Sequence, residues 1–275
     1  MPGTKSSRLA MIFVLIAGLS PIGSGAAENL DITGVMKERS AALVTVKYVL
    51  HVNMGNTRGN QENETENELT CTMIRADGLI VCSNNQLGGF INMIARMSGQ
   101  LGKTMSATAK NLEVIVDSHE QVFDAEIIAV DTELDIAWVQ ITDTGDTSFS
   151  FIDFTTGGTA DIGDTVITLR RTGNYFGRTL VVARNHVGGI TDKPRKLYIL
   201  ESAFANGAGL PGFDGNGKVI GLIVTQFPET TDNMGARMGF MGSGMANIQE
   251  AMSGVILPAK EITKATQRAM EVESY

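Results

Sequence analysis

Residues 74 to 86 decide the fold that this sequence predicts, and they read Ile74-Arg75-Ala76-Asp77-Gly78-Leu79-Ile80-Val81-Cys82-Ser83-Asn84-Asn85-Gln86. Asp77-Gly78 is a strong turn signal where hydrophobic residues stand on both sides of it. The flanking runs therefore predict a β-hairpin with one strand over residues 69–74 and the other over residues 79–83. This hairpin is the starting point of an all-β interpretation.

Cys71 and Cys82, the two cysteines of the chain, lie on opposite strands of this hairpin. If Arg75 faces Gly78 across the turn, the cysteines are directly opposite each other. In the alternative register they are diagonal neighbours on the same face, so both registers keep them close. A disulfide would form in an oxidising compartment. Two small buried thiols fit the sequence equally well.

Strand patterns recur along the chain in two groups, with Val, Ile and Leu alternating between short polar turns. The first group covers residues 42–52, 69–74, 79–83, 111–117, 122–130 and 136–141. The second group covers residues 165–170, 179–184, 197–202, 218–225 and 254–257. Many short strands in two sets predict an all-β fold of two packed barrels.

The remaining segments are expected to form loops and short helices. The polar residues 53–68 predict an exposed loop. Helices are expected at residues 29–39 and 260–273, and residues 90–110 predict a short helix followed by a loop. The first barrel is accordingly assigned to residues 28–148, and the second barrel with the final helix to residues 149–275.

The composition and the first residues point to an exported globular protein. Of the 275 residues, 43% are hydrophobic and 19% are charged, which is typical of a folded chain. The net charge is -8 without a basic run, so nucleic acid is not an expected partner. Lys5 and Arg8, an apolar run over residues 9–19 and small residues at 24–27 predict a signal peptide over residues 1–27. The protein is therefore expected to be secreted or periplasmic without a later membrane span, or membrane-anchored if the signal is not cleaved.

Five segments, taken in order, carry a resemblance to a known family. They are the hairpin at residues 74–86, DTELDIAWVQI at 131–141, GDTVITLRRTGNYFG at 163–177, NGAGLPGFDGNGKVIG at 206–221 and GVILP at 254–258. This series resembles the HtrA/DegP group of trypsin-like serine proteases, over roughly residues 40–269. The resemblance implies the two-barrel chymotrypsin/trypsin-like fold. The family's downstream peptide-binding PDZ module is not expected here, because about seventeen residues follow Pro258.

The resemblance places the family's catalytic triad at Gln86, Asp135 and Ala208, and two of these residues cannot do the chemistry. Ala208 has no oxygen with which to attack a carbonyl group, and the neutral carboxamide of Gln86 is not a base. Asp135 matches the family, although a structural role at a turn, or a hydrogen bond to Gln86, explains it as well. The resemblance thus implies a protease homologue that has lost its activity.

The backbone of the nucleophile loop can keep a function after the side chains have lost theirs. By resemblance, the N–H groups of Asn206 and Ala208 would form the oxyanion hole. Leu210 stands where the family has a glycine. If that glycine requires a positive φ, a leucine there would strain or reshape the loop.

Other candidate residues carry weaker signals. His51, His119 and His186 lack a second ligand at metal spacing, so neither a metal nor a cofactor is expected. Ser202 and Ser243 come without a neighbouring base and are poor candidates for a displaced nucleophile.

Three functions follow as hypotheses. The first is an inactive homologue that binds an extended peptide or a partner protein in its cleft, because proteases of this fold hold substrate as an added strand. The alternatives are an active serine-type endopeptidase with non-standard residues, and a structural or assembly protein of the cell envelope. In the last case the contact would be the final helix or the Met-rich stretch 227–252, an adaptable apolar loop with soft-metal binding as the alternative.

Overall fold

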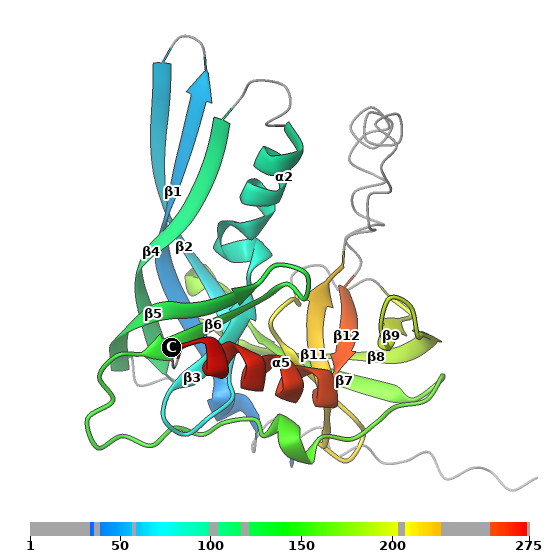
Figure 1. Cartoon of the computed structure of the whole chain (residues 1–275). Coiled ribbons are helices and arrows are strands. Elements are labelled where there is room, and N and C mark those ends of the chain that lie inside the picture. The colour runs from blue at the N-terminus through cyan, green and yellow to red at the C-terminus, as the bar shows by residue number, and fades with distance from the viewer. Residues whose placement is uncertain are drawn as a thin grey trace, which may run out of the picture.

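The computed structural model describes residues 34–35, 39–56, 59–98, 104–116, 121–202, 207–226 and 254–273. They form two closed, antiparallel, six-stranded barrels and a helix at the C-terminal end (Figure 1). The expected all-β, two-barrel fold is therefore confirmed. The expected N-terminal helix at residues 29–39 and the expected signal peptide lie mostly or wholly outside the described residues.

The first barrel closes in the strand order β1-β2-β3-β6-β5-β4. Its strands are β1 (Leu43–Asn56), β2 (Gly59–Met73), β3 (Leu79–Ser83), β4 (Thr104–Val116), β5 (Gln121–Asp131) and β6 (Ile136–Ile141). Strand β3 is buried along its whole length, and Trp138 on β6 is among the largest fully buried side chains. The hydrophobic run that followed Asp77-Gly78 in the sequence thus forms a central part of the core.

The second barrel closes in the strand order β10-β11-β12-β9-β8-β7. Its strands are β7 (Thr165–Arg171), β8 (Leu180–Thr191), β9 (Leu197–Leu200), β10 (Pro211–Phe213), β11 (Val219–Thr225) and β12 (Gly254–Pro258). Tyr198 and Phe213 fill its interior. Strand β10 has only three residues, two of them Pro and Gly, and the sequence has no alternating pattern there that would predict a strand.

Among the described residues, two α-helices accompany the barrels. Helix α2 (Phe90–Ser98) stands beside β4, where Asn92 exchanges two hydrogen bonds with the backbone of Ala107. Helix α5 (Ala259–Glu273) confirms the expected final helix, and Figure 1 shows it crossing in front of both barrels. Trp138 of the first barrel donates a hydrogen bond to Thr266 of this helix at 3.0 Å. Helix α5 therefore ties the two barrels together.

The prediction of an exposed loop at residues 53–68 is wrong. Strands β1 and β2 pair without interruption out to Asn56 and Gly59, and they rise above the barrel as a ribbon with β4 beside them (Figure 1). Strand β4 likewise begins at Thr104, inside the stretch expected to be helix and loop. Side chains 61–66 are exposed on both faces of the ribbon, so the ribbon needs no hydrophobic alternation and left no strand pattern in the sequence.

The hairpin of β2 and β3 has the register in which the cysteines are directly opposite. Thr72 pairs with Val81, and the Ile74 N–H donates a hydrogen bond to the Leu79 carbonyl across the turn. A disulfide joins Cys71 to Cys82, with their Cα atoms 4.8 Å apart. The strands that lead to the candidate site are therefore covalently linked.

Candidate functional site

Gln86 lies in a short turn of π-helical type, Asn85–Gly89, directly after β3. Its carbonyl oxygen accepts a hydrogen bond from the Tyr48 hydroxyl at 2.7 Å, and its N–H donates one to Ser83 Oγ at 3.4 Å. Burial raises the pKa of Tyr48, so this hydroxyl stays protonated and keeps its role as donor. The backbone at position 86 is fixed by the barrel, while the carboxamide remains half-buried.

Asp135 is buried in the turn before β6, with a positive φ of 59°. Its carboxylate accepts hydrogen bonds from Ser83 Oγ at 3.0 and 3.1 Å, from the Asn85 N–H at 2.8 Å and from the Thr225 N–H at 3.0 Å. Burial raises the pKa of Asp135, and these hydrogen bonds oppose the rise. The carboxylate thus connects the turn after β3 with the end of β11 in the second barrel.

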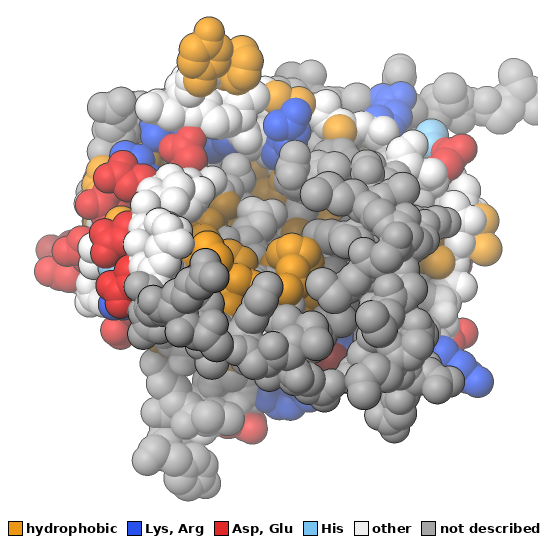
Figure 2. Space-filling model, turned by 90° about the horizontal axis from the view of Figure 1, so that it is seen from above, with side chains coloured by type: hydrophobic (Ala, Val, Ile, Leu, Met, Phe, Trp, Pro, Cys, Tyr) orange, Lys and Arg blue, Asp and Glu red, His pale blue; other side chains and the backbone are white. Residues whose placement is uncertain are grey.

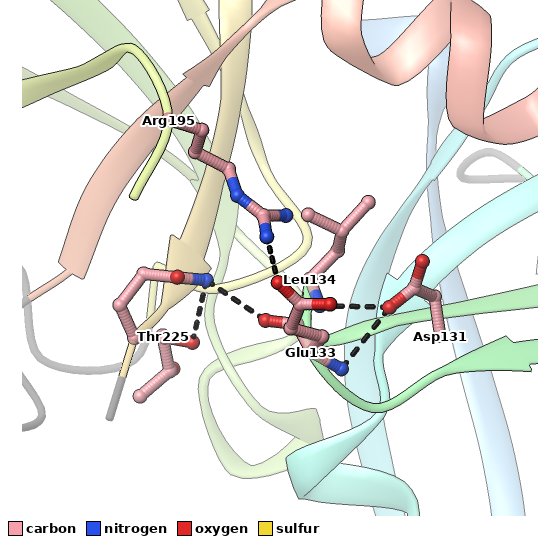
Figure 3. A network of polar contacts seen from close by, with 6 residues as sticks. Asp131, Glu133, Leu134, Arg195 and Thr225 are labelled. Atoms are coloured by element: carbon pink, nitrogen blue, oxygen red, sulfur yellow. Dashed lines mark hydrogen bonds and ion pairs between the residues drawn. The ribbon is translucent and has the colours of Figure 1, made fainter. Parts of the chain in front are cut away.

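A polar network braces the turn that carries Asp135 (Figure 3). The Asp131 carboxylate accepts hydrogen bonds from the N–H groups of Glu133 and Leu134, at 3.0 and 2.9 Å. Arg195 of the second barrel forms an ion pair with the Glu133 carboxylate, and Gln226 donates a hydrogen bond to the Glu133 carbonyl at 3.2 Å. Contacts from both barrels therefore hold the position of this turn.

The loop that carries Ala208 packs against the first barrel. Gly209 has a φ of +88°, and a Cβ placed there would lie 2.9 Å from the Ser83 nitrogen. Thr72 Oγ1 donates a hydrogen bond to the Gly209 carbonyl at 2.7 Å. The positive φ therefore falls on Gly209 and not on Leu210, which is buried in the core. The leucine at position 210, where the resembled family has a glycine, therefore packs in the core without a positive φ.

Gln86 and Ala208 line one hollow of about 270 Å³ between the barrels. The other described residues around it come from β1, β2, β7 and the turn after β7, and they are Thr45, Glu68, Leu69, Thr70, Arg170, Arg171, Thr172 and Gly173. Among these described residues there is no serine, cysteine or histidine. Asp135 is not part of this lining. Asp135 and Gln86 are both described by the structure, and no hydrogen bond joins the carboxylate of the first to the carboxamide of the second.

Strand β2 presents a free edge beside this hollow. It pairs with β1 from Gly59 to Thr72, but within the described strands it pairs with β3 only through Thr72 and Met73. The neighbouring residues Leu69 and Thr70 line the hollow with Gln86 and Ala208. An extended chain laid there would find unpaired backbone groups of a strand.

The remaining sequence candidates lie elsewhere. The His51 ring contacts Glu64 at 3.1 Å and lines a separate hollow on the ribbon, and His186 contacts Glu201 at 3.4 Å. Ser202 bonds through its backbone to Asn185. Asn206, His119, Ser243 and the Met-rich stretch 227–252 lie outside the described residues. Within the part of the chain that the structure describes, no group of three acidic, His or Cys side chains could hold a metal ion.

Sequence reasoning missed the residues that join the two barrels above the hollow. Both carboxylate oxygens of Glu68 bind the turn after β7: one accepts from the Asn174 N–H at 2.6 Å and the other from Arg178 at 2.9 Å. These three residues also line a second hollow of about 530 Å³ on the outer face of β1, β2 and β4. Glu68 fell in the stretch interpreted as a loop, whereas the motif at residues 173–177 was visible in the sequence without a role.

Comparisons with known proteins give a likeness of fold only. No family model and no curated protein matches the chain. A solved structure of the HtrA-type protease AlgW, a serine-to-alanine variant with a tripeptide, superposes with a TM-score of 0.52 at 14% identity. The match covers 86% of this chain and 62% of that one. No described helix is long and apolar enough to span a bilayer. The chain has a trypsin-like two-barrel fold.

Proposed function

We propose that this protein is a catalytically inactive protease homologue that binds an extended peptide segment in the hollow between its barrels. The observation that carries the proposal is the meeting of Gln86, Ala208 and the free edge of β2 at one hollow. The residues come from distant parts of the chain, and by the resemblance Gln86 and Ala208 match positions beside the substrate in a protease of this fold.

The chemistry at the hollow argues against acyl transfer. That reaction needs a nucleophile with a hydroxyl or thiol group and a base beside it. Position 208 supplies a methyl group and position 86 a carboxamide. The threonines of the lining, Thr45, Thr70 and Thr172, have no imidazole among the described residues around them to accept a proton. The rings of His51 and His186 contact Glu64 and Glu201 on other surfaces.

Binding, in contrast, needs only groups that remain in place. A peptide that adds to the edge of β2 gains main-chain hydrogen bonds, and these do not depend on a catalytic triad. The hollow also offers the side-chain amide of Gln86 as donor and acceptor. A groove of this kind binds a stretch of unfolded or extended chain from a partner protein.

Activity is tested first with a fluorophosphonate probe and a casein-release assay on the purified protein. We expect no labelling and no release from the wild type, and the same from Ala208→Ser alone because that serine has no base. The double change Gln86→His with Ala208→Ser restores both groups and is expected to give measurable labelling. Labelling of the wild type that survives removal of contaminating proteases overturns the inactive state.

Binding is tested by selecting random peptides on the protein and measuring the dissociation constant of a fluorescent copy of the best one. Gly173→Trp fills the mouth of the hollow without strain, because a Cβ there meets only Glu68 Oε1 at 3.5 Å. We expect this variant to weaken binding at least tenfold. Ile162→Trp adds the same bulk at an exposed site away from the hollow and should bind as the wild type does. Equal affinities for all three proteins would contradict the location of the site.

A further inference from the structure

Two aromatic side chains stand exposed directly beside the hollow. In the 3-10 turn Asn174–Phe176, Tyr175 is 92% exposed and Phe176 is 67% exposed, the most exposed aromatic residues among the described large hydrophobic ones. Their rings contact each other edge to face, with centroids 5.0 Å apart. Monomeric proteins expose single hydrophobic residues routinely, but two adjacent exposed aromatic side chains are typical of a contact surface.

The turn that carries the pair is held firmly in place. The Glu68 carboxylate binds both ends of the turn, through the Asn174 N–H and the Arg178 guanidinium. Thr179 Oγ1 donates a hydrogen bond to the Phe176 carbonyl at 2.7 Å, and Gly177 ends the turn in the left-handed region. The rings are therefore presented on a rigid support, which lowers the entropy cost of binding.

The same turn separates and borders the two hollows. Gly173 lines the hollow with Ala208, Asn174 lines the larger one, and Glu68 lines both. Strand β2 runs past both hollows: its residues 68–70 line the first hollow, and its residues 66–68 line the second. At about 3.3 Å per residue, these five positions span roughly five residues of an extended peptide. Figure 2 shows hydrophobic side chains around a depression on the face seen from above, with acidic ones gathered along one side.

The larger hollow has the polarity of a peptide-binding surface. Its lining includes the side-chain amides of Asn67, Asn111 and Asn174, each of which can donate to and accept from a peptide group. Lys47, Glu66 and Glu113 add charges of both signs, beside the ion pair of Glu68 with Arg178. The Tyr175–Phe176 pair at its border offers an exposed contact of aromatic size, whereas Tyr48 of the lining is buried.

The geometry points to a second contact for the same peptide: the Tyr175–Phe176 pair packs against one large apolar side chain of an extended segment that leaves the Ala208 hollow along β2. This inference rests on the proposed function, since the peptide must lie in the hollow to reach the pair. It adds a specificity: the partner carries a Leu, Met, Phe or similar side chain a few residues away from the part bound beside Ala208. Aromatic residues of this kind dominate the energy of many interfaces.

The test uses the fluorescent peptide selected on the full chain and a set of its alanine-scanned copies. The double variant Tyr175→Ser with Phe176→Ser should weaken binding by roughly tenfold or more, as truncation of aromatic anchors does. In the wild type one apolar peptide position should be sensitive to alanine, and in the double variant that sensitivity should disappear. Ile162→Ser removes an equally exposed apolar side chain and should change nothing.

The outcomes separate the two proposals. If the wild type and the double variant bind the peptide equally, with the same sensitive positions, the aromatic contact is wrong and the peptide-binding function stands. If the wild type selects no peptide, both proposals are wrong. Because both rings are exposed, the double variant is expected to fold, and its thermal midpoint should match that of the wild type.

Discussion

The Asp135 carboxylate in the first barrel accepts a hydrogen bond from the Thr225 N–H in the second barrel at 3.0 Å. The same carboxylate binds Ser83 and the Asn85 N–H at the end of β3. It therefore joins the two barrels directly beneath the turn that carries Gln86. A residue that matches a catalytic position by sequence thus has a structural task that is independent of catalysis.

The stability of the fold should decrease as this carboxyl group ionises. Burial raises the pKa of Asp135 above its ordinary 3.8, so the unfolded chain releases this proton at a lower pH than the folded chain does. The stabilisation that the protonated Asp135 gives to the folded state is fully present below pH 3.8, and it is lost as the pH rises through the pKa of the folded protein. Asp135→Asn resembles the protonated acid and does not titrate. The free energy of unfolding of the wild type, minus that of this variant, should fall with rising pH in urea titrations. A difference that grows with pH would show that the hydrogen bonds outweigh burial.

Gly209→Ala should destabilise the protein more than Gly163→Ala does. Both glycines have a positive φ, +88° and +92°, where an alanine costs roughly 1–2 kcal/mol. Only at Gly209 does the added Cβ also meet backbone atoms, the Ser83 nitrogen at 2.9 Å, whereas nothing lies within 4 Å at Gly163. We expect an additional loss of about 1–3 kcal/mol at Gly209, measured by denaturant unfolding. Equal losses would mean that the loop does not pack on β3 as described.

The disulfide should contribute to stability through the short loop that it closes. Cys71 and Cys82 are 11 residues apart, and the chain-entropy relation gives about 3 kcal/mol for such a loop. The double change Cys71→Ala with Cys82→Ala should lower the free energy of unfolding by this amount. Reductant should lower the stability of the wild type and leave the double variant unchanged. A wild type that is insensitive to reductant would argue for two unlinked thiols in solution.

Glu68 should control the mobility of the turn that borders both hollows. Glu68→Gln keeps the shape of the side chain but weakens its bonds to the Asn174 N–H and to Arg178. Hydrogen exchange of residues 173–178 should become faster, with a loss of stability of about 1 kcal/mol. Glu66→Gln removes the same charge from the same strand and the same hollow without contacting the turn, so exchange there should stay at the wild-type rate. Faster exchange in both variants would point to a general charge effect.

The sequence predicted most strands of both barrels, because short hydrophobic runs stand between polar turn residues, and several of these runs are buried along all or nearly all of the strand. It failed at the ribbon of β1 and β2, where side chains 61–66 are exposed on both faces and no alternation is needed. It also missed β10, whose three residues include Pro211 and Gly212. At the site, resemblance alone selected Gln86, Asp135 and Ala208. The lining residues Glu68, Arg170 and Thr45 gave no local signal, because their roles depend on the approach of distant strands.

The covalent chain alone determined which chemical groups stand at positions 86 and 208. A carboxamide and a methyl group lack the attacking atom and the base in any fold, so this property needs no coordinates. Which residues lie together was decided only by the tertiary structure. Glu68 and Arg178 are 110 positions apart and meet because two barrels close and pack against each other. That packing depends on burial summed over both cores, which no short stretch of sequence encodes.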